Sequence, residues 1–220
     1  MPKATAKRRR PSQTRSAFTV DAILQGASEL LVDRGARKLT TNAIAERSGV
    51  SIGTLYQYFA NKEAIVDALR LQHGTDVLHA LGTAAQTPCG AKAEDVLTKM
   101  IRANVDAHLK NPRLHRVLTV DNPKLTVGPR GSVCPYQAAH QALFADTESR
   151  FADLLPHLDR ERQVRPMLAG VFGLVEAMTH ALVVDCPSEA SAHELERIIF
   201  ASSQACMDQF VRHEAMTRPF

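Results

Sequence analysis

Histidine and cysteine are the residues of this 220-residue chain that could bind a metal ion or act in catalysis, and their spacing favours neither role. His193 and Glu194 begin like the zinc-binding pattern HExxH, but Arg197 occupies the position of the second histidine. The four cysteines lie far apart and form no Cys-x-x-Cys pair, which predicts free thiols rather than a disulfide framework, with a thiol switch as the alternative. We therefore expect no metal site and no cofactor.

The sequence patterns of common enzyme sites are also missing from the chain. It contains no G-x-S-x-G nucleophile elbow, no G-x-x-x-x-G-K-[ST] phosphate loop and no G-x-G-x-x-G dinucleotide motif. We therefore expect that the protein is not an enzyme. A helical enzyme without these patterns is the alternative.

Basic residues gather at the N-terminus. Residues 1–15 carry six lysines and arginines, and the first acidic residue is Asp21, whereas the rest of the chain holds 21 bases and 23 acids. Basic arms of this kind bind polyanions, although a solvated tail that only improves solubility is the alternative. The arginines that could enter a DNA minor groove, or hold phosphates without base specificity, are Arg8, Arg9, Arg10 and Arg15.

The sequence predicts neither a secretory signal nor a membrane span. Residues 1–15 contain no apolar run, and the longest apolar stretch, 167–184, is interrupted by Glu176, Thr179 and His180. A helix that crosses a bilayer needs roughly 20 nearly uncharged residues. We therefore expect a soluble, cytoplasmic protein with no membrane partner.

Prolines and apolar periodicity predict an all-α fold. No proline lies between Pro11 and Pro88, and proline is excluded from helix interiors. Within the proline-free segments, apolar residues recur at intervals of three and four, as in the stripe from Val20 to Leu31. No segment alternates apolar and polar residues long enough to predict a strand. The segment 121–135, rich in proline and glycine, is expected to be an irregular connection.

The segment 39–62, LTTNAIAERSGVSIGTLYQYFANK, has the pattern of a helix-turn-helix. Thr40 can cap a helix that ends at Arg47, Gly49 can take the positive φ that turns the chain, and Ser51 can cap the next helix. The apolar residues spaced to face inward from that second helix are Ile52, Leu55 and Phe59. In such motifs the second helix lies in a DNA major groove.

The run from Phe18 to Leu69 resembles the N-terminal domain of the TetR/AcrR family of bacterial transcriptional regulators. The resemblance covers about a quarter of the chain. Its most specific part is TLYQYFANKE, residues 54–63, because a helix-turn-helix pattern alone is common. The other matching pieces are Arg34-Gly35 at the end of the first helix, Thr40-Thr41, Ile44-Ala45 and Gly49-Val50.

The resemblance implies a domain organisation. Residues 1–15 would be a basic disordered arm, 16–74 a three-helix helix-turn-helix DNA-binding domain, and 75–220 a larger helical domain that binds an effector and dimerises. The all-α fold would contain about nine helices in total.

The resemblance also implies residues that contact DNA. The exposed face of the recognition helix would comprise Ser51, Ile52, Gly53, Thr54, Tyr56 and Gln57. The amide of Gln57 can bond adenine N6 and N7, and Gly53 would let the backbone approach the base edges. Phosphates would be held by Thr41, Tyr56, Tyr58 and Lys62, and Asn42 matches a family position that sometimes touches bases. Tyr58 and Phe59 could instead belong to the core, and the residues at 52 and 57 differ from those common in the family.

In the second domain, the resemblance implies an effector pocket and a dimer interface. Glu176 and His180 lie four residues apart, so they could pair on one helix face. The interface would use the last two helices, about 166–185 and 189–213, unless they pack only within one subunit. The candidate pocket residues are Met100, Asn104, His108, His140, Phe144, Phe172, Glu176 and His180.

The function implied is that of a homodimeric, sequence-specific DNA-binding transcriptional regulator. We expect a repressor that an unknown small-molecule effector releases from a two-fold operator in double-stranded DNA. A transcriptional activator of the same fold, an architectural DNA-binding protein and a helical enzyme are the alternatives.

Overall fold

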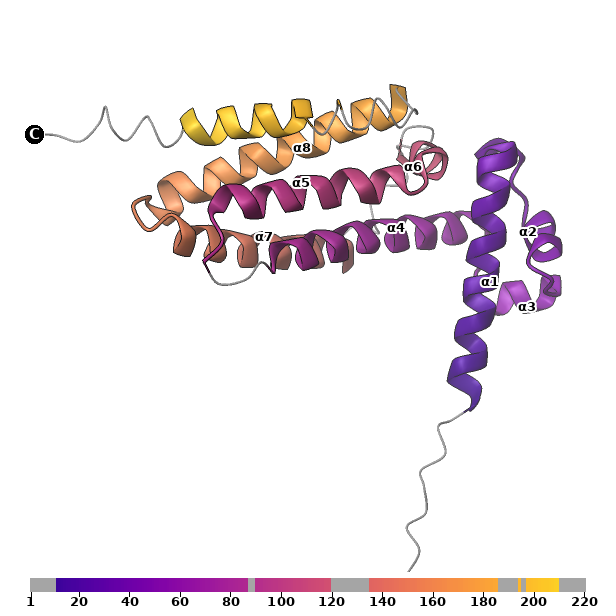
Figure 1. Ribbon diagram of the computed structural model, residues 1–220. Coiled ribbons are helices and arrows are strands. Elements are labelled where there is room, and N and C mark those ends of the chain that lie inside the picture. Colours follow the sequence, from indigo (N-terminus) through magenta and orange to yellow (C-terminus); the bar gives the residue numbers. More distant parts are fainter. Residues whose placement is uncertain (1–10, 87–89, 120–134, 186–193, 195–196, 210–220) are drawn as a thin grey trace, which may run out of the picture. The chain divides into compact units, whose positions relative to one another are not determined.

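The computed structural model describes residues 11–86, 90–119, 135–185, 194 and 197–209 (Figure 1). Within these ranges the regular elements are all helical, which confirms the predicted all-α fold. None of the described helices is long and apolar enough to cross a membrane. The basic arm up to residue 10 and most of the predicted connection at 121–135 lie outside the described residues.

The elements follow one another along the chain, with the helical segment 197–209 as the last of them. They are α1 (Pro11–Arg34), the 3-10 turn η1 (Ala36–Lys38), α2 (Thr41–Arg47), α3 (Ile52–Tyr58), α4 (Lys62–Ala85), α5 (Ala93–Leu109), α6 (Pro112–Thr119), α7 (Pro135–Leu154), the π-helical turn η3 (Arg160–Val164) and α8 (Arg165–Asp185).

The chain divides into two compact units. The first contains the described residues of Met1–Arg70 and Val117–Pro123, and the second those of Leu71–Arg116 and Lys124–Phe220. The division therefore falls within α4 and within α6, rather than at a separate linker.

In the first unit, short-range hydrogen bonds fix the ends of α2 and α3. The hydroxyl of Thr40 accepts a hydrogen bond from the Ala43 amide at 3.2 Å, and that of Ser51 accepts one from the Thr54 amide at 3.0 Å. Gly49 turns the chain between the two helices with φ of 67°. The capping and turn predicted for the helix-turn-helix are confirmed.

The core of this unit joins α1 to the helix-turn-helix. Its fully buried side chains come from α1, α2, α3 and α4 and include Ile23, Leu31, Ile44, Leu55 and Ile65. The prediction that Ile52 faces inward with Leu55 is wrong, because Ile52 is 39% exposed. Ile52 is the first residue of α3, so no preceding turn of that helix covers its side chain.

A close helix crossing lies at Gly26 of α1, which is buried. A Cβ atom on this residue would overlap the hydroxyl oxygen of Ser48 and lie 3.2 Å from the Ser48 backbone nitrogen. The hydroxyl of Ser48 is itself held by the carbonyl of Ile44, to which it donates at 2.7 Å. Only glycine at position 26 lets the end of α2 approach α1 this closely.

In the second unit, α4, α5, α7, η3, α8 and the segment 197–209 share one apolar core. Figure 1 shows α5 lying along α8, with the segment 197–209 beside them. Among the most deeply buried side chains are Val96, Phe151, Val164, Met167, Leu168 and Ile199.

A buried carboxylate of α7 forms ion pairs with the turn η3 and with the first residue of α8. The carboxylate of Glu148, only 2% exposed, accepts hydrogen bonds from Nε of Arg165 and from Nε of Arg160, each at 2.8 Å. The hydrogen bonds from Arg165 and Arg160 hold the pKa of Glu148 below its ordinary value of 4.5.

The lowered pKa of Glu148 predicts a pH-dependent contribution to stability. We expect Glu148→Gln to lower the melting temperature at neutral pH by about 2–4 °C, the effect of about 1 kcal/mol in a domain of this size. Because the carboxylate is favoured in the folded state, its contribution is present above pH 4.5 and is lost as the pH falls below that value. Thermal unfolding by circular dichroism at neutral and acidic pH measures this.

Glu161→Gln is the matched control, since Glu161 also pairs with Arg165 but is 65% exposed. The prediction would be contradicted if the two substitutions lowered the melting temperature equally at neutral pH. It would also be contradicted if the difference in melting temperature between wild type and Glu148→Gln persisted at acidic pH.

Candidate DNA-binding surface, cavity and histidine cluster

Helix α3 presents most of the predicted base-contacting residues to solvent. Leu55 anchors the helix in the core, and Ser51, Ile52, Gly53, Tyr56 and Gln57 are exposed. The predicted set also includes Thr54, which is partly buried and whose hydroxyl lies 2.8 Å from that of Ser51. Capping therefore already occupies the Ser51 and Thr54 hydroxyls, and Gln57 carries the free amide of this face.

The space around Gly53 is open. A Cβ atom built at this position would meet only the Ser51 hydroxyl, at 3.8 Å. The fold itself thus tolerates a larger side chain at Gly53, unlike at Gly26.

Two of the predicted phosphate-contacting residues are in contact, and the others lie apart from them. Thr41 and Tyr56 come together, because their hydroxyl oxygens lie 3.1 Å apart across α2 and α3. Lys62 is partly buried at the start of α4, where its ammonium donates to the carbonyl of Leu39 at 3.2 Å. Tyr58 is 37% exposed, and Asn42 is exposed. The side chains of Arg8, Arg9, Arg10 and Arg15 lie outside the described residues.

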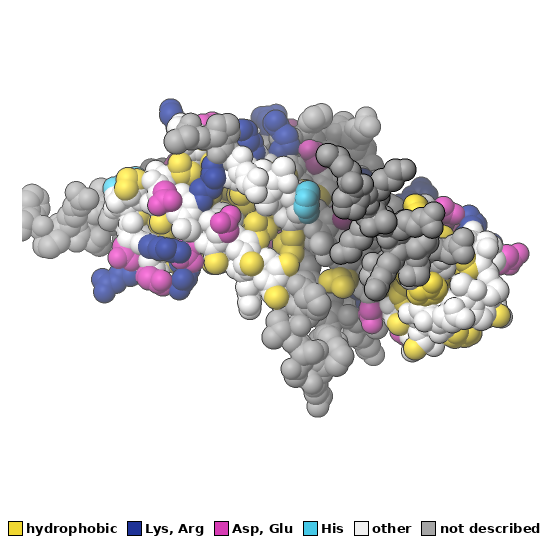
Figure 2. Space-filling model, turned by 90° about the horizontal axis from the view of Figure 1, so that it is seen from below, with side chains coloured by type: hydrophobic (Ala, Val, Ile, Leu, Met, Phe, Trp, Pro, Cys, Tyr) yellow, Lys and Arg dark blue, Asp and Glu magenta, His cyan; other side chains and the backbone are white. Residues whose placement is uncertain are grey.

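The basic excess belongs to the N-terminal part of the sequence. Residues 1–62 hold 11 bases and 4 acids, whereas residues 63–220 hold 16 bases and 19 acids. On the face seen in Figure 2, Lys and Arg side chains are interspersed with Asp and Glu side chains and with exposed apolar groups. In the first unit, three of the described arginines are paired with acids. They are Arg34 with Asp33, Arg47 with Glu29 and Arg70 with Asp67.

The second unit contains a cavity of about 660 Å³ between α4, α5, α7 and α8. Its walls are mostly apolar, and the rings of Phe144 and Phe172 meet edge to face with their centroids 5.9 Å apart. Six of the eight predicted pocket residues line it, namely Met100, Asn104, His140, Phe144, Phe172 and Glu176. The other two, His108 and His180, lie in a separate histidine cluster.

Polar groups of the cavity wall meet near Glu176. Its carboxylate lies 3.0 Å from Nε2 of His180, which confirms the predicted pairing of these two residues. Burial alone would raise the pKa of Glu176. This effect is outweighed by the hydrogen bond and charge of His180, followed by the charge of His108 and a hydrogen bond from Asn104, so the pKa is lowered to about 2. Asn104 is 3% exposed, and its Oδ1 accepts no hydrogen bond from the described residues. This oxygen is therefore a buried acceptor without a donor among the described residues.

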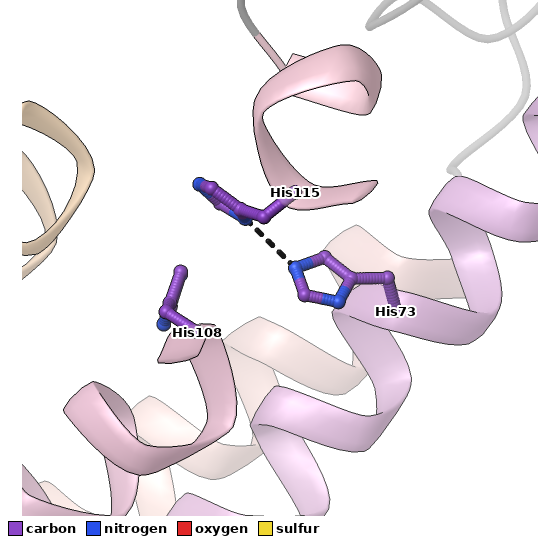
Figure 3. Close-up of side chains that lie close together, drawn as sticks. All are labelled: His73, His108 and His115. Carbon is purple, nitrogen blue, oxygen red and sulfur yellow. Dashed lines mark hydrogen bonds between the residues drawn. The ribbon is translucent and has the colours of Figure 1, made fainter. Parts of the chain in front are cut away.

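Four histidines pack against one another beside this cavity. They are His73 of α4, His108 of α5, His115 of α6 and His180 of α8, and Figure 3 shows the first three converging. The rings of His108 and His115 have centroids 4.6 Å apart, and Nε2 of His73 lies 2.9 Å from Nδ1 of His115. Burial and the neighbouring imidazoles lower the pKa of His115 to about 3, and burial also lowers the pKa values of His73 and His108.

The histidine cluster has no signature in the sequence, because each helix contributes only one ring. The one partial signal is His108, which continues a buried face of α5 through Met100, Ile101 and Asn104. A polar residue at a core position of an amphipathic helix needs a partner, but sequence spacing does not say which helix supplies it. His73 and His115 are thus the site residues that sequence reasoning missed.

Comparison with known proteins matches the first unit. The sequence profile described as bacterial regulatory proteins, tetR family, matches residues 23–69. The transcriptional regulator YvkB of Bacillus subtilis is 44% identical over 54 residues, which are 24% of this chain and 29% of that protein. The class C tetracycline repressor protein of Escherichia coli is 49% identical over 49 residues, 22% of each chain.

A longer match is found with the regulator YdeS of Bacillus subtilis, which is 36% identical over 93 residues, 42% of each chain. The aligned segments thus span less than half the length of these curated relatives.

Solved structures extend the likeness of fold to the second unit. A TetR family transcription regulator from Marinobacter aquaeolei superposes with a TM-score of 0.60 at 20% identity, covering 88% of this chain and 97% of that one. The fatty acid degradation regulator FadR of Bacillus halodurans gives a TM-score of 0.62 at 16% identity, with the same coverage. The profile match thus assigns residues 23–69 to the tetR family of bacterial regulatory proteins, and the solved structures show that the chain has the fold of TetR family regulators.

Proposed function

We propose that the protein is a homodimeric regulator that binds a two-fold DNA operator through α3 and represses transcription until a small molecule binds the second unit. The observation that carries the proposal is the capped helix α3, whose exposed face presents Gly53, Tyr56 and Gln57 within the segment that matches the family profile. Repression is supported by one relative, named as a tetracycline repressor protein.

In this proposal α3 lies in a major groove. The amide of Gln57 bonds the N6 and N7 atoms of adenine, and the exposed side chain of Ile52 packs on a thymine methyl group. The open space at Gly53 lets the helix backbone approach the base edges. Thr41 and Tyr56 hold one phosphate together, since their hydroxyls are already adjacent. The ammonium of Lys62 donates one hydrogen to the carbonyl of Leu39, and its remaining hydrogens can bind a phosphate.

The cavity of the second unit is the proposed effector site. Its apolar walls suit a largely apolar molecule, and the Oδ1 of Asn104, which has no donor among the described residues, favours a molecule that carries a hydrogen-bond donor. The effector releases DNA only if it binds the DNA-free state more tightly than the DNA-bound one.

The dimer interface is proposed to involve α8. Small side chains repeat every four residues along its exposed surface, at Ala169, Gly173, Ala177 and Ala181, so that another helix can approach closely. Ile199 is buried in the core of this unit and Phe172 packs against that core, so neither residue is proposed for the interface. Two-fold operators require two recognition helices spaced about 34–36 Å apart.

Substitution of Gln57 tests the readout of DNA. We expect Gln57→Ala to relax base preference at one adenine per half-site, a loss of about 1–3 kcal/mol of discrimination, without changing the melting temperature. Selection of binding sites from a randomised duplex library by each protein measures this.

Gln72→Ala is the control, because Gln72 is an exposed glutamine of α4 outside the helix-turn-helix. Unchanged selectivity of Gln57→Ala would remove Gln57 from base readout. If the wild-type protein selects no site at all, the proposal of sequence-specific DNA binding is wrong.

Sedimentation tests the proposed dimer. We expect the wild-type protein to sediment as a dimer at micromolar concentration and Ala177→Arg to shift it toward monomer, because an arginine would enter the helix contact. Ala142→Arg, on the exposed surface of α7, should leave the dimer intact. A wild-type monomer both alone and on DNA would rule out this interface.

A further inference from the structure

The histidine cluster has the donor set of a metal site. One nitrogen from each of His73, His108 and His115 lies within 4.8 Å of the others, and these residues come from three different helices (Figure 3). A second group of the same kind, His108, Glu176 and His180, shares His108 with the first. Both groups lie in the second unit, and neither is part of the proposed DNA contact.

The hydrogen bonds around two of these rings are those that orient metal ligands. Nδ1 of His108 donates to the carbonyl of Asn104 at 2.7 Å, which leaves Nε2 of that ring as the nitrogen able to bind an ion. Nε2 of His180 lies 3.0 Å from the Glu176 carboxylate, which leaves Nδ1 of His180. Metal-binding histidines typically donate their second ring N–H to a backbone carbonyl or to a carboxylate.

The spacing of His73 and His115 requires only a small adjustment. In a tetrahedral zinc site with Zn–N bonds of about 2.0–2.1 Å, ligand nitrogens lie about 3.3 Å apart. Nε2 of His73 and Nδ1 of His115 are 2.9 Å apart, so an ion between them would replace their hydrogen bond after an opening of a few tenths of an ångström. The ring centroid of His180 lies 5.2 Å from that of His108 and 4.7 Å from that of His115, so a fourth imidazole lies beside these two rings.

We propose that His73, His108, His115 and His180 bind one divalent transition-metal ion, with zinc best suited to the geometry, and that the Glu176 carboxylate orients His180. Imidazole is a preferred ligand of zinc, copper and nickel, whereas magnesium and calcium prefer oxygen. This site replaces the sequence-based expectation that the chain binds no metal. It does not depend on the proposed DNA binding, and it differs from the apolar cavity in the chemistry of its ligand.

Metal titration of the untagged, chelator-treated full-length protein tests the site. We expect calorimetry to give one zinc ion per chain with micromolar or tighter Kd, and cobalt(II) to give the intense visible bands of a tetrahedral nitrogen site. His73→Gln should weaken zinc binding at least about tenfold, and Glu176→Gln by about 10–100-fold, the usual effect of losing an orienting carboxylate. Zinc should also raise the melting temperature of the wild-type protein.

His79→Gln is the matched control, because His79 is an exposed histidine on the same helix as His73 and lies outside the cluster. It should bind zinc as the wild type does. His73 is only partly buried, so its glutamine variant should keep the helical circular dichroism of the wild type. The proposal is overturned if the wild type binds no zinc below millimolar concentration, if cobalt gives only an octahedral spectrum, or if His73→Gln and His79→Gln bind zinc equally.

Discussion

Replacing Gly26 with alanine should lower the free energy of unfolding of the first unit by about 1–3 kcal/mol, the usual effect of overpacking a well-packed core. The direction is the opposite of that expected from helix propensity, since alanine is favoured over glycine in a helix by about 1 kcal/mol. Here the added methyl group would meet both the hydroxyl and the backbone nitrogen of Ser48. Because the backbone nitrogen cannot rotate away, the end of α2 must move.

The displacement of α2 should also reduce DNA binding, because α3 follows directly after the turn at Gly49. Gly82→Ala in α4 is the matched control, since its added methyl group would make only an ordinary contact, 3.7 Å from Leu143. Denaturant unfolding monitored by circular dichroism should show Gly26→Ala less stable and Gly82→Ala as stable as the wild type or more so. Equal stability of the two variants would show that the crossing of α1 and α2 relaxes freely.

Removal of residues 1–10 should weaken DNA binding at all sequences by tenfold or more at low salt. This segment holds five bases, Lys3, Lys7, Arg8, Arg9 and Arg10, and no acid. For every phosphate that the shortened protein no longer neutralises, the plot of log affinity against log salt should become flatter by about 0.9. Fluorescence anisotropy with a labelled operator at several salt concentrations measures the slope.

Two further variants separate charge from shape in the arm. Replacing the five bases with glutamine keeps the length of the arm and removes its charge. If the charge is responsible for binding, this variant should show the same loss of DNA affinity and the same flatter salt slope as the truncated protein. Replacing Arg8, Arg9 and Arg10 with lysine keeps the charge, and should preserve the salt slope but lower any preference for a narrow A·T-rich minor groove. A salt slope that the truncation leaves unchanged would place the arm outside the interface.

The sequence predicted the helix-turn-helix well because its structure is determined locally. Thr40, Gly49 and Ser51 act on residues within a few positions of themselves, so spacing alone identifies their roles. Ile52 was misplaced because burial depends on which helix covers a position, and the first residue of α3 is not covered. The crossing at Gly26 has no local signal for the same reason, since its partner Ser48 lies at the end of another helix.

The second unit was harder to predict because its sites are assembled from distant segments. Six of the predicted pocket residues line the cavity because large apolar side chains and polar groups on amphipathic helices predict a shared interior. The histidine cluster brings together residues 73, 108, 115 and 180, whose separations in sequence match no metal-binding pattern. Only packing of α4, α5, α6 and α8 makes them neighbours.

The open space at Gly53 bears on how this protein evolves. A glycine inside a helix costs roughly 0.5–1 kcal/mol relative to alanine, and no neighbour in the fold requires its small size. Folding alone would therefore favour a larger residue at position 53, whereas the proposed approach of the helix backbone to DNA favours glycine. The stability of α3 and the proposed DNA recognition thus favour different residues at position 53. A larger side chain there would change the surface that faces DNA without disturbing the fold.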